Sequence, residues 1–154
     1  MTLIAISGPH GSGKSTLAKA LAEKLNLRYL SAGTIFRKLA REYNMSIIEF
    51  TYYVAKHPEI DLLIDQSMRE EAKKGNAVLD SQLAYWMVKD LNPVKILVTA
   101  EKKDRIIRLM EREKLSYEAA KKEIEIREEE EKKRFKSLYG IDLWNPDDFH
   151  IVIN

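Results

Sequence analysis

Short apolar runs alternate along the chain with longer stretches of mixed polarity. The runs at 2–7, 27–31, 77–80, 95–100 and 149–154 have the length of strands and contain few charged residues. Runs of this kind are typical of strands buried in a parallel sheet. Because helical patterns separate them, we expect strands to alternate with helices in an α/β sandwich around a mostly parallel sheet.

The first helical pattern follows the first strand, at residues 14–26. Its apolar residues share one helical face, which is formed by Leu17, Ala18, Leu21, Ala22 and Leu25. Since the next strand is expected at 27–31, the three elements form a strand–helix–strand unit. The crossover of such a unit is expected to be right-handed.

The region 33–75 is predicted to be helical in short pieces. Ser46 and Glu49 have the spacing of a capping box, which places the start of a helix at this point. Pro58 separates two of the pieces, and Gly75 ends the last one.

A second helical region, 101–139, is strongly charged and is interrupted at 113–116. We find no internal repeat, linker or low-complexity tract in the 154 residues. The chain is therefore expected to form one domain, which is large enough to bury a core of its own.

The composition excludes several classes of function. The formal net charge is only +2 and the basic residues are not gathered at one end, which argues against a dedicated nucleic-acid-binding tail. The chain has no cysteine, which excludes disulfides and thiolate metal sites, and its three histidines, His10, His57 and His150, do not have the spacing of a zinc site. No apolar run approaches the roughly 20 residues of a membrane span. Since the first residues also lack the basic segment of a signal peptide, we expect a cytoplasmic protein.

The segment "SGPHGSGKST" at 7–16 has the glycine and lysine spacing of a phosphate-binding loop. It follows an apolar strand and opens a helix, as such a loop requires. Glycines permit backbone conformations that turn successive amides toward phosphate oxygens, and the helix N-terminus adds positive potential. The residues expected to contact ATP are Gly8, Pro9, His10, Gly11, Ser12, Gly13, Lys14, Ser15 and Thr16.

Within this loop, Lys14 is expected to reach the β- and γ-phosphates, and the Ser15 hydroxyl to bind Mg²⁺. Asp80 ends an apolar strand and is the carboxylate best placed to complete the magnesium site, although an aspartate here is also a common turn or helix cap. Nothing in the sequence requires His10 to take part in chemistry, so we interpret it as a spacer that faces solvent.

Further segments resemble one kinase family. "SGPHGSGKSTLAKALAEKL" followed by "YLSAGTIFRKLA" resembles the nucleoside monophosphate kinases, in which a Ser/Thr-x-Gly-x-x-x-Arg segment opens the acceptor site. "HPEIDLLID", "AVLDSQLAYWM" and "REEEEKKRFKSLYGID" narrow the resemblance to the compact archaeal-type cytidylate kinases. The resemblance covers nearly the whole chain and keeps the order of the motifs.

This resemblance implies a P-loop NTPase fold. Its expected form is a three-layer α/β sandwich with a five-stranded parallel sheet, a helical acceptor arm and a short helical lid. The core would comprise 1–32, 76–111 and 135–154, the acceptor-binding arm 33–75, and the lid about 113–127.

The resemblance also implies which residues bind the acceptor nucleotide. Ser31, Gly33 and Arg37 match the acceptor segment, and the planar guanidinium of Arg37 suits a phosphate dianion. Two positions depart from the family pattern. Gln82 stands where many relatives carry a basic residue able to hold the acceptor phosphate, and Thr34 stands where related adenylate kinases have an aspartate.

The charged helical region carries a second set of implied site residues. Arg108 and Arg112 lie four residues apart and match the arginines at the base of a lid over ATP. Arg127, Glu131 and Arg134 share one helix face. By resemblance, these arginines draw the donor and acceptor phosphates together, and Glu131 and Arg134 read the acceptor base. Without the resemblance, the same stretch is equally typical of a solvated helix with many i,i+4 ion pairs.

A third departure concerns the end of the sequence. Relatives continue into one more helix beyond the last strand, whereas the sequence ends at Asn154. Either the sequence is a shortened piece, or the last strand is covered on one face only.

The predicted activity is an ATP-dependent kinase that transfers the γ-phosphate in line, with Mg²⁺, to CMP or dCMP. A nucleotide monophosphate has a second pKa near 6, so its attacking oxygen is largely ionised at pH 7 and no general base is required. Catalysis then depends on positive charge around the transferring phosphoryl group. The side chains expected to supply it are Lys14, Arg37, Arg108, Arg112, Arg127 and Arg134.

Three alternatives to this activity can be compared with the sequence. The acceptor base can be that of AMP or UMP, because a few hydrogen bonds decide it. A GTPase-type switch would need a guanine-specifying Asn-Lys-x-Asp segment, which the sequence lacks. An ATP-driven assembly factor on a kinase-like fold is disfavoured by the nearly balanced charge. The expected partners are small nucleotides, without nucleic acid or membrane, and we expect a monomer because no stretch indicates an exposed apolar patch.

Overall fold

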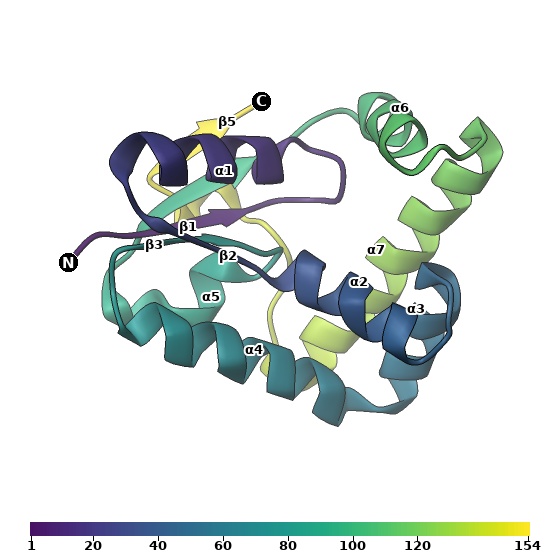
Figure 1. Cartoon of the computed structure of the whole chain (residues 1–154), viewed down its shortest axis with the longest axis horizontal. Coiled ribbons are helices and arrows are strands. Elements are labelled where there is room, and N and C mark those ends of the chain that lie inside the picture. The colour runs from purple at the N-terminus through teal and green to yellow at the C-terminus, as the bar shows by residue number, and fades with distance from the viewer.

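A five-stranded, fully parallel sheet forms the centre of the structure (Figure 1). The computed structural model describes residues 1–154. The strands are β1 (Leu3–Ser7), β2 (Arg28–Ser31), β3 (Ala77–Asp80), β4 (Val94–Val98) and β5 (Ile151–Ile153), in the spatial order β2-β3-β1-β4-β5. The connection from β1 and the connection from β3 leave in opposite directions. The carboxyl ends of these two neighbouring strands therefore form a switch point, which is where parallel sheets bind ligands.

Helices cover both faces of the sheet. Helix α1 (Lys14–Leu25) lies on one face, and α4 (Pro58–Lys73) with the short α5 (Ala84–Met87) lies on the other (Figure 1). Side chains of successive residues in β1 point to opposite faces of the sheet, because side chains alternate along a strand. Ile4 and Ile6 pack with α1, whereas Leu3 and Ala5 pack with α4 and α5. This arrangement confirms the predicted three-layer sandwich.

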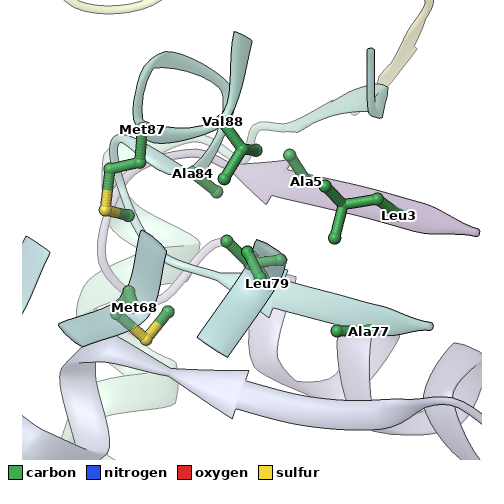
Figure 2. Close-up of a cluster of buried hydrophobic side chains, with 9 residues drawn as sticks. Leu3, Ala5, Met68, Ala77, Leu79, Ala84, Met87 and Val88 are labelled. Atoms are coloured by element: carbon green, nitrogen blue, oxygen red, sulfur yellow. The ribbon is translucent and has the colours of Figure 1, made fainter. Parts of the chain in front are cut away.

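Figure 2 shows the core on the α4 side, where side chains of β1 and β3 meet those of two helices. Leu79 of β3 points toward Met68 of α4, and Ala84 and Val88 close the cluster from the α5 side. The small residues Ala5, Ala77 and Ala84 let the helices approach the sheet closely. All three are fully buried.

The remaining helices form the arm and the long charged region. The segment predicted to form the arm contains α2 (Ala32–Glu42), α3 (Ile47–Lys56) and α4, which pack around Phe36, Ala40, Phe50, Val54 and Ile64. The charged region forms α6 (Lys102–Glu113) and α7 (Tyr117–Tyr139), which pack together through Ile106, Leu109, Ala120 and Ile124. Helix α7 also lies against α3, so it connects the charged region with the arm (Figure 1).

Most predicted elements are present, with differences at their ends. The capping box at Ser46 and Glu49 is confirmed, and Pro58 occupies the first turn of α4. The stripe on α1 is correct except for Leu25, which is half exposed because α1 ends there, beyond the edge of the core. The last strand comprises Ile151–Ile153 and is shorter than the predicted 149–154; a 3-10 turn at Pro146–Asp148 lies before it. Helix α5 and a 3-10 turn at Lys89–Leu91 are too short to produce a periodic pattern.

None of the helices combines the length and the apolar character that a bilayer-spanning segment requires.

The packing of the sheet predicts that two leucines differ strongly in how much their replacement by alanine lowers the free energy of unfolding. Leu79 is fully buried in β3, whereas Leu63 on the outer face of α4 is 64% exposed. We expect Leu79→Ala to lower the free energy of unfolding by about 2–5 kcal/mol, because it leaves a cavity in the core. The matched variant Leu63→Ala is expected to change it by no more than about 0.5 kcal/mol. Urea unfolding followed by circular dichroism measures both, and equal losses would contradict the packing described.

Candidate active site

A cavity of about 300 Å³ opens at the carboxyl ends of β1 and β3. Its volume lies at the lower end of the range for small-molecule sites. Its walls come from the phosphate loop, α2, α4, the segment after β3, α6 and α7. Most residues that the sequence analysis proposed lie on this wall, namely His10, Gly11, Gly13, Lys14, Ser15, Thr16, Ser31, Gly33, Arg37, Asp80, Gln82, Arg108, Arg112, Arg127, Glu131 and Arg134. Gly8, Pro9 and Ser12 belong to the loop but not to the wall.

The phosphate loop is held by close backbone contacts that only glycine permits. Gly8 has φ +150°, and a Cβ on it would lie 2.0 Å from the carbonyl oxygen of Val98 in β4. Gly13 has φ +97° and caps α1, which begins at Lys14. The first amides of a helix lack intrahelical partners and favour a bound anion. The loop therefore has the form that phosphate binding requires.

Lys14 is buried beside this helix start. Burial lowers the pKa of Lys14; the carboxylate of Asp80 opposes this shift, and the positive charge of Arg127 adds to it. A bound anion would relieve both the burial cost and the repulsion, because opposite charge favours the protonated amine.

Asp80 lies at the end of β3, opposite Ile6 of β1 and Ser31 of β2 in the register of the sheet. Its side chain is buried, and the Tyr29 hydroxyl donates a hydrogen bond to its Oδ2 at 2.6 Å. Burial raises the pKa of Tyr29 and the bond to Asp80 raises it further, so the tyrosine stays protonated and keeps its donor role. Tyr29 was not predicted as a site residue, because a tyrosine within a strand is typical of packing.

The residues present fit a magnesium ion. No group of three or more His, Cys, Asp or Glu side chains gathers anywhere in the structure. Mg²⁺ does not require such a group, since it is usually held by one or two carboxylates together with water and substrate phosphates. Ser15 and Asp80 both line the cavity. They are the residues that would hold the ion.

The interpretation of His10 as a spacer that faces solvent is wrong. Its side chain is only 14% exposed, because α7 passes over the loop, and its Nε2 lies 2.9 Å from Oε2 of Glu131. Burial lowers the pKa of His10 to about 3, so the ring is neutral at pH 7 and donates Nε2–H to the carboxylate. Burial alone would raise the pKa of Glu131, but its interactions with His10, Arg127 and Lys14 lower it, and the carboxylate stays ionised.

Five arginines line the cavity, namely Arg37, Arg108, Arg112, Arg127 and Arg134. Arg108 donates a hydrogen bond from Nη1 to the carbonyl oxygen of Gly11 at 3.0 Å. Arg127 is buried and its guanidinium lies 5.1 Å from the ring centre of Phe36. Burial lowers the pKa of Arg37, and the charges of Arg112 and Arg127 lower it further. Positive charge is thus concentrated around the loop.

Sequence reasoning missed Arg105, which supports the loop from behind. It is buried, forms an ion pair with Glu128, and donates a hydrogen bond to the carbonyl oxygen of His10 at 3.4 Å. Its backbone also lies so close to Gly11 that a Cβ there would be 2.7 Å from the Arg105 carbonyl oxygen. An arginine in a charged helix is normally solvated, so the sequence alone offered no signal.

On the α4 side of the cavity, two further carboxylates were missed. Asp61 is buried and forms an ion pair with Arg134 of α7, and Asp65 accepts a hydrogen bond from the Tyr139 hydroxyl at 2.5 Å. Burial raises the pKa of Asp65 to about 6 and lowers the pKa of Arg134 to about 10. Both aspartates lie in α4, where their spacing of four residues is also common on a solvated helix face.

Two family models match the chain. The cytidylate kinase-like family matches residues 59–154, and the cytidylate kinase family matches residues 4–52. The chain is 46% identical to a cytidylate kinase of Ignicoccus hospitalis over all 154 residues, which is 90% of that relative. It is 41% identical to a cytidylate kinase of Archaeoglobus fulgidus, over 98% of this chain and 84% of the relative.

Solved structures with the same fold are more distant in sequence. A shikimate kinase from Acinetobacter baumannii matches with a TM-score of 0.58 at 16% identity, over 100% of this chain and 83% of that one. A shikimate kinase from Bacteroides thetaiotaomicron matches with a TM-score of 0.59 at 15% identity, over 99% of this chain and 85% of that one. At this identity the similarity shows the P-loop kinase fold alone.

The burial of His10 predicts how stability depends on pH. Its pKa is lower in the folded protein than the usual 6.5, so the unfolded chain binds a proton first. The stabilising contribution is complete above pH 6.5 and is lost as the pH falls below it. We expect His10→Gln, whose amide can still donate to Glu131, to reduce the loss of unfolding free energy between pH 7 and pH 4 by about 2 kcal/mol.

The matched control is His57→Gln, because His57 is 41% exposed. Urea unfolding at a series of pH values measures all three proteins. The same pH dependence in His10→Gln and in the unmodified chain would show that His10 is not buried in its neutral form.

Proposed function

Because this chain belongs to the cytidylate kinase-like family, together with its archaeal members, we propose that it transfers the γ-phosphate of ATP to CMP or dCMP and releases ADP. The observation that carries the proposal is the cavity at the phosphate loop. In it, a helix N-terminus, Lys14 and five arginines face one space large enough for a small molecule. Such a concentration of positive charge suits two polyanions that must be brought together.

We place the two phosphate groups by the charges that surround them. The triphosphate of ATP would lie along the phosphate loop, against Lys14 and the start of α1. Arg108 of α6 donates a hydrogen bond to the carbonyl oxygen of Gly11 in this loop, and Arg112 of α6 lines the same cavity. The acceptor phosphate would lie between the loop and the arm, where Arg37 and Arg127 line the wall. Ser31 caps α2 by accepting a hydrogen bond from the Thr34 amide at 3.2 Å, which keeps the start of the acceptor arm in place.

The mechanism follows from the chemistry of the acceptor. Its phosphate is largely a dianion at pH 7, so the attacking oxygen needs no general base. Neutral His10 is engaged with Glu131 and takes no proton from the substrate in this mechanism. The arginines neutralise charge on the attacking and transferring groups and hold them in line. Ser15 and Asp80 would hold a Mg²⁺ ion, which when bound supplies positive charge to the phosphates.

Water must be excluded, since otherwise ATP would be hydrolysed. We propose that the arm at 33–75 and the lid at about 113–127 close over the substrates. The lid range comprises the turn at 114–116 and the first half of α7.

The function is tested by a coupled assay of ADP release with ATP, Mg²⁺ and either CMP, dCMP, UMP or AMP. We expect CMP and dCMP to give turnover at least about tenfold above UMP and AMP, because a few hydrogen bonds to the base distinguish the acceptors. Turnover with AMP instead would keep the mechanism and overturn the base assignment. Slow ADP release at the same rate without any acceptor would overturn the kinase activity.

The role of Lys14 is tested by Lys14→Met. This change keeps the length of the side chain and removes its charge, so we expect kcat to fall by about 10²–10³-fold, as for the loss of one transition-state donor. The matched control is Lys24→Met, because Lys24 is exposed at the far end of the same helix. Circular dichroism of both variants checks the fold. An unchanged kcat in Lys14→Met would exclude this residue from phosphoryl transfer.

A further inference from the structure

The α4 side of the cavity differs from the phosphate-loop side in its chemistry. Asp61, Asp65, Gln82 and Arg134 line it among the apolar side chains of Phe36, Ile64, Leu83 and Phe135. The hydrogen bonds and ion pairs of Asp61 and Asp65 come from α7 and not from the phosphate loop. This side therefore combines apolar walls with a few polar groups, a composition that suits a flat heterocycle better than a phosphate.

Two hydrogen-bond donors on this side have no partner. The Nη1 of Arg134 and the Nε2 of Gln82 are both buried and donate no hydrogen bond to any protein atom. A buried donor without an acceptor is costly, so such groups normally await a ligand or a water molecule. These two side chains therefore supply donors for acceptor atoms of a bound molecule.

Asp65 forms no ion pair with any cation of the cavity wall. Asp61 pairs with Arg134, Glu131 lies beside Arg127, and Asp80 acts on the charge of Lys14. Asp65 receives only the Tyr139 hydroxyl, on Oδ2. Burial, with no cation beside it, raises its pKa to about 6. The carboxyl group is thus oriented by Tyr139 and retains acceptor capacity toward the cavity.

These donors and acceptors match one pyrimidine edge. Cytosine presents an amino group as donor and two acceptors, the ring nitrogen N3 and the oxygen O2. Uracil presents an oxygen in place of the amino group and an N–H in place of the bare nitrogen. A carboxylate accepts a hydrogen bond from the amino group but repels the oxygen of uracil.

Resting on the proposed function, we propose that Asp65 selects cytosine by accepting a hydrogen bond from its 4-amino group, while Arg134 and Gln82 donate to the acceptors of the same edge. Asp61 is then a positioning residue, because its ion pair orients the guanidinium of Arg134. When a site that hydrogen-bonds one substrate binds another, a buried polar group is left without a partner. The free-energy cost of this unpaired group is the source of the discrimination.

The test compares kcat/KM for CMP and for UMP in the full chain and in Asp65→Asn. Asparagine has the same size, but its amide can donate to the oxygen of uracil. We expect the ratio of kcat/KM for CMP over UMP to fall at least 30-fold, with a gain for UMP as well as a loss for CMP. Titration calorimetry of CMP and UMP is expected to show the same change in binding preference.

Two control variants separate base reading from a structural role. Asp142→Asn makes the same chemical change at a surface side chain that is 83% exposed, and should keep the ratio of the unmodified chain. Tyr139→Phe removes the hydrogen bond to Asp65 but keeps the carboxylate, and should keep the preference for CMP within about threefold. Thermal unfolding shows whether each variant is folded.

The outcomes distinguish this proposal from the proposed function. If the unmodified chain uses CMP and Asp65→Asn lowers kcat/KM equally for CMP and UMP, Asp65 has a structural role. The proposal on Asp65 then fails, while the proposed function stands. If Tyr139→Phe and Asp65→Asn change the ratio alike, the Asp65–Tyr139 hydrogen bond, and not the carboxylate itself, decides the base, and the proposal also fails. If the unmodified chain phosphorylates no nucleoside monophosphate, the proposed function fails first.

Discussion

The parallel pairing of β1 with β3 is the constraint on which the rest of the site depends. It places Ile6 opposite Asp80, so the phosphate loop and the segment from Asp80 to Gln82 leave the sheet at the same edge. Gly8 then approaches the carbonyl oxygen of Val98, on the other side of β1, so closely that no side chain fits. The loop is thus enclosed between its two neighbouring strands before any helix contributes. Sheet topology, and not nearness in sequence, brings Asp80 beside the phosphate loop, where it and Ser15 are the proposed ligands of magnesium.

Helix α7 contributes three charged side chains to the cavity at this end of the sheet, and all three are buried. Arg127, Glu131 and Arg134 are each less than a tenth exposed. Burying ions in a protein is costly unless they are paired and hydrogen-bonded. Glu131 is satisfied by His10 and Arg134 in part by Asp61. The remaining, unpaired positive charge lowers the stability of the empty site and favours a bound polyanion, so affinity for nucleotides and stability of the free protein oppose each other.

Local sequence patterns predicted the parts of the structure that depend on local spacing. The loop that ends at Lys14, the helix start at Ser46 and the end of a strand at Asp80 were all visible as short motifs. The contacts that were missed join distant segments. The sequence predicts His10 to be a spacer because its partner Glu131 lies in another element. Asp65 is oriented by Tyr139, which is distant in sequence, so local spacing gives no sign of this contact. The family resemblance supplied the arginines of α7, which periodicity alone does not distinguish from a solvated face.

The neutral side chain of Gln82 is consistent with the charge already present in the cavity. Gln82 is buried on the same wall as Arg37, Arg127 and Arg134. The pKa values of Arg37 and Arg134 are already lowered, chiefly by burial, so one more buried cation here would increase the repulsion in the free protein. An amide supplies a hydrogen-bond donor without adding charge. Under the proposed function, the arginines would then bind the phosphates and Gln82 would donate to the base, which offers a physical reason for this departure from the family pattern.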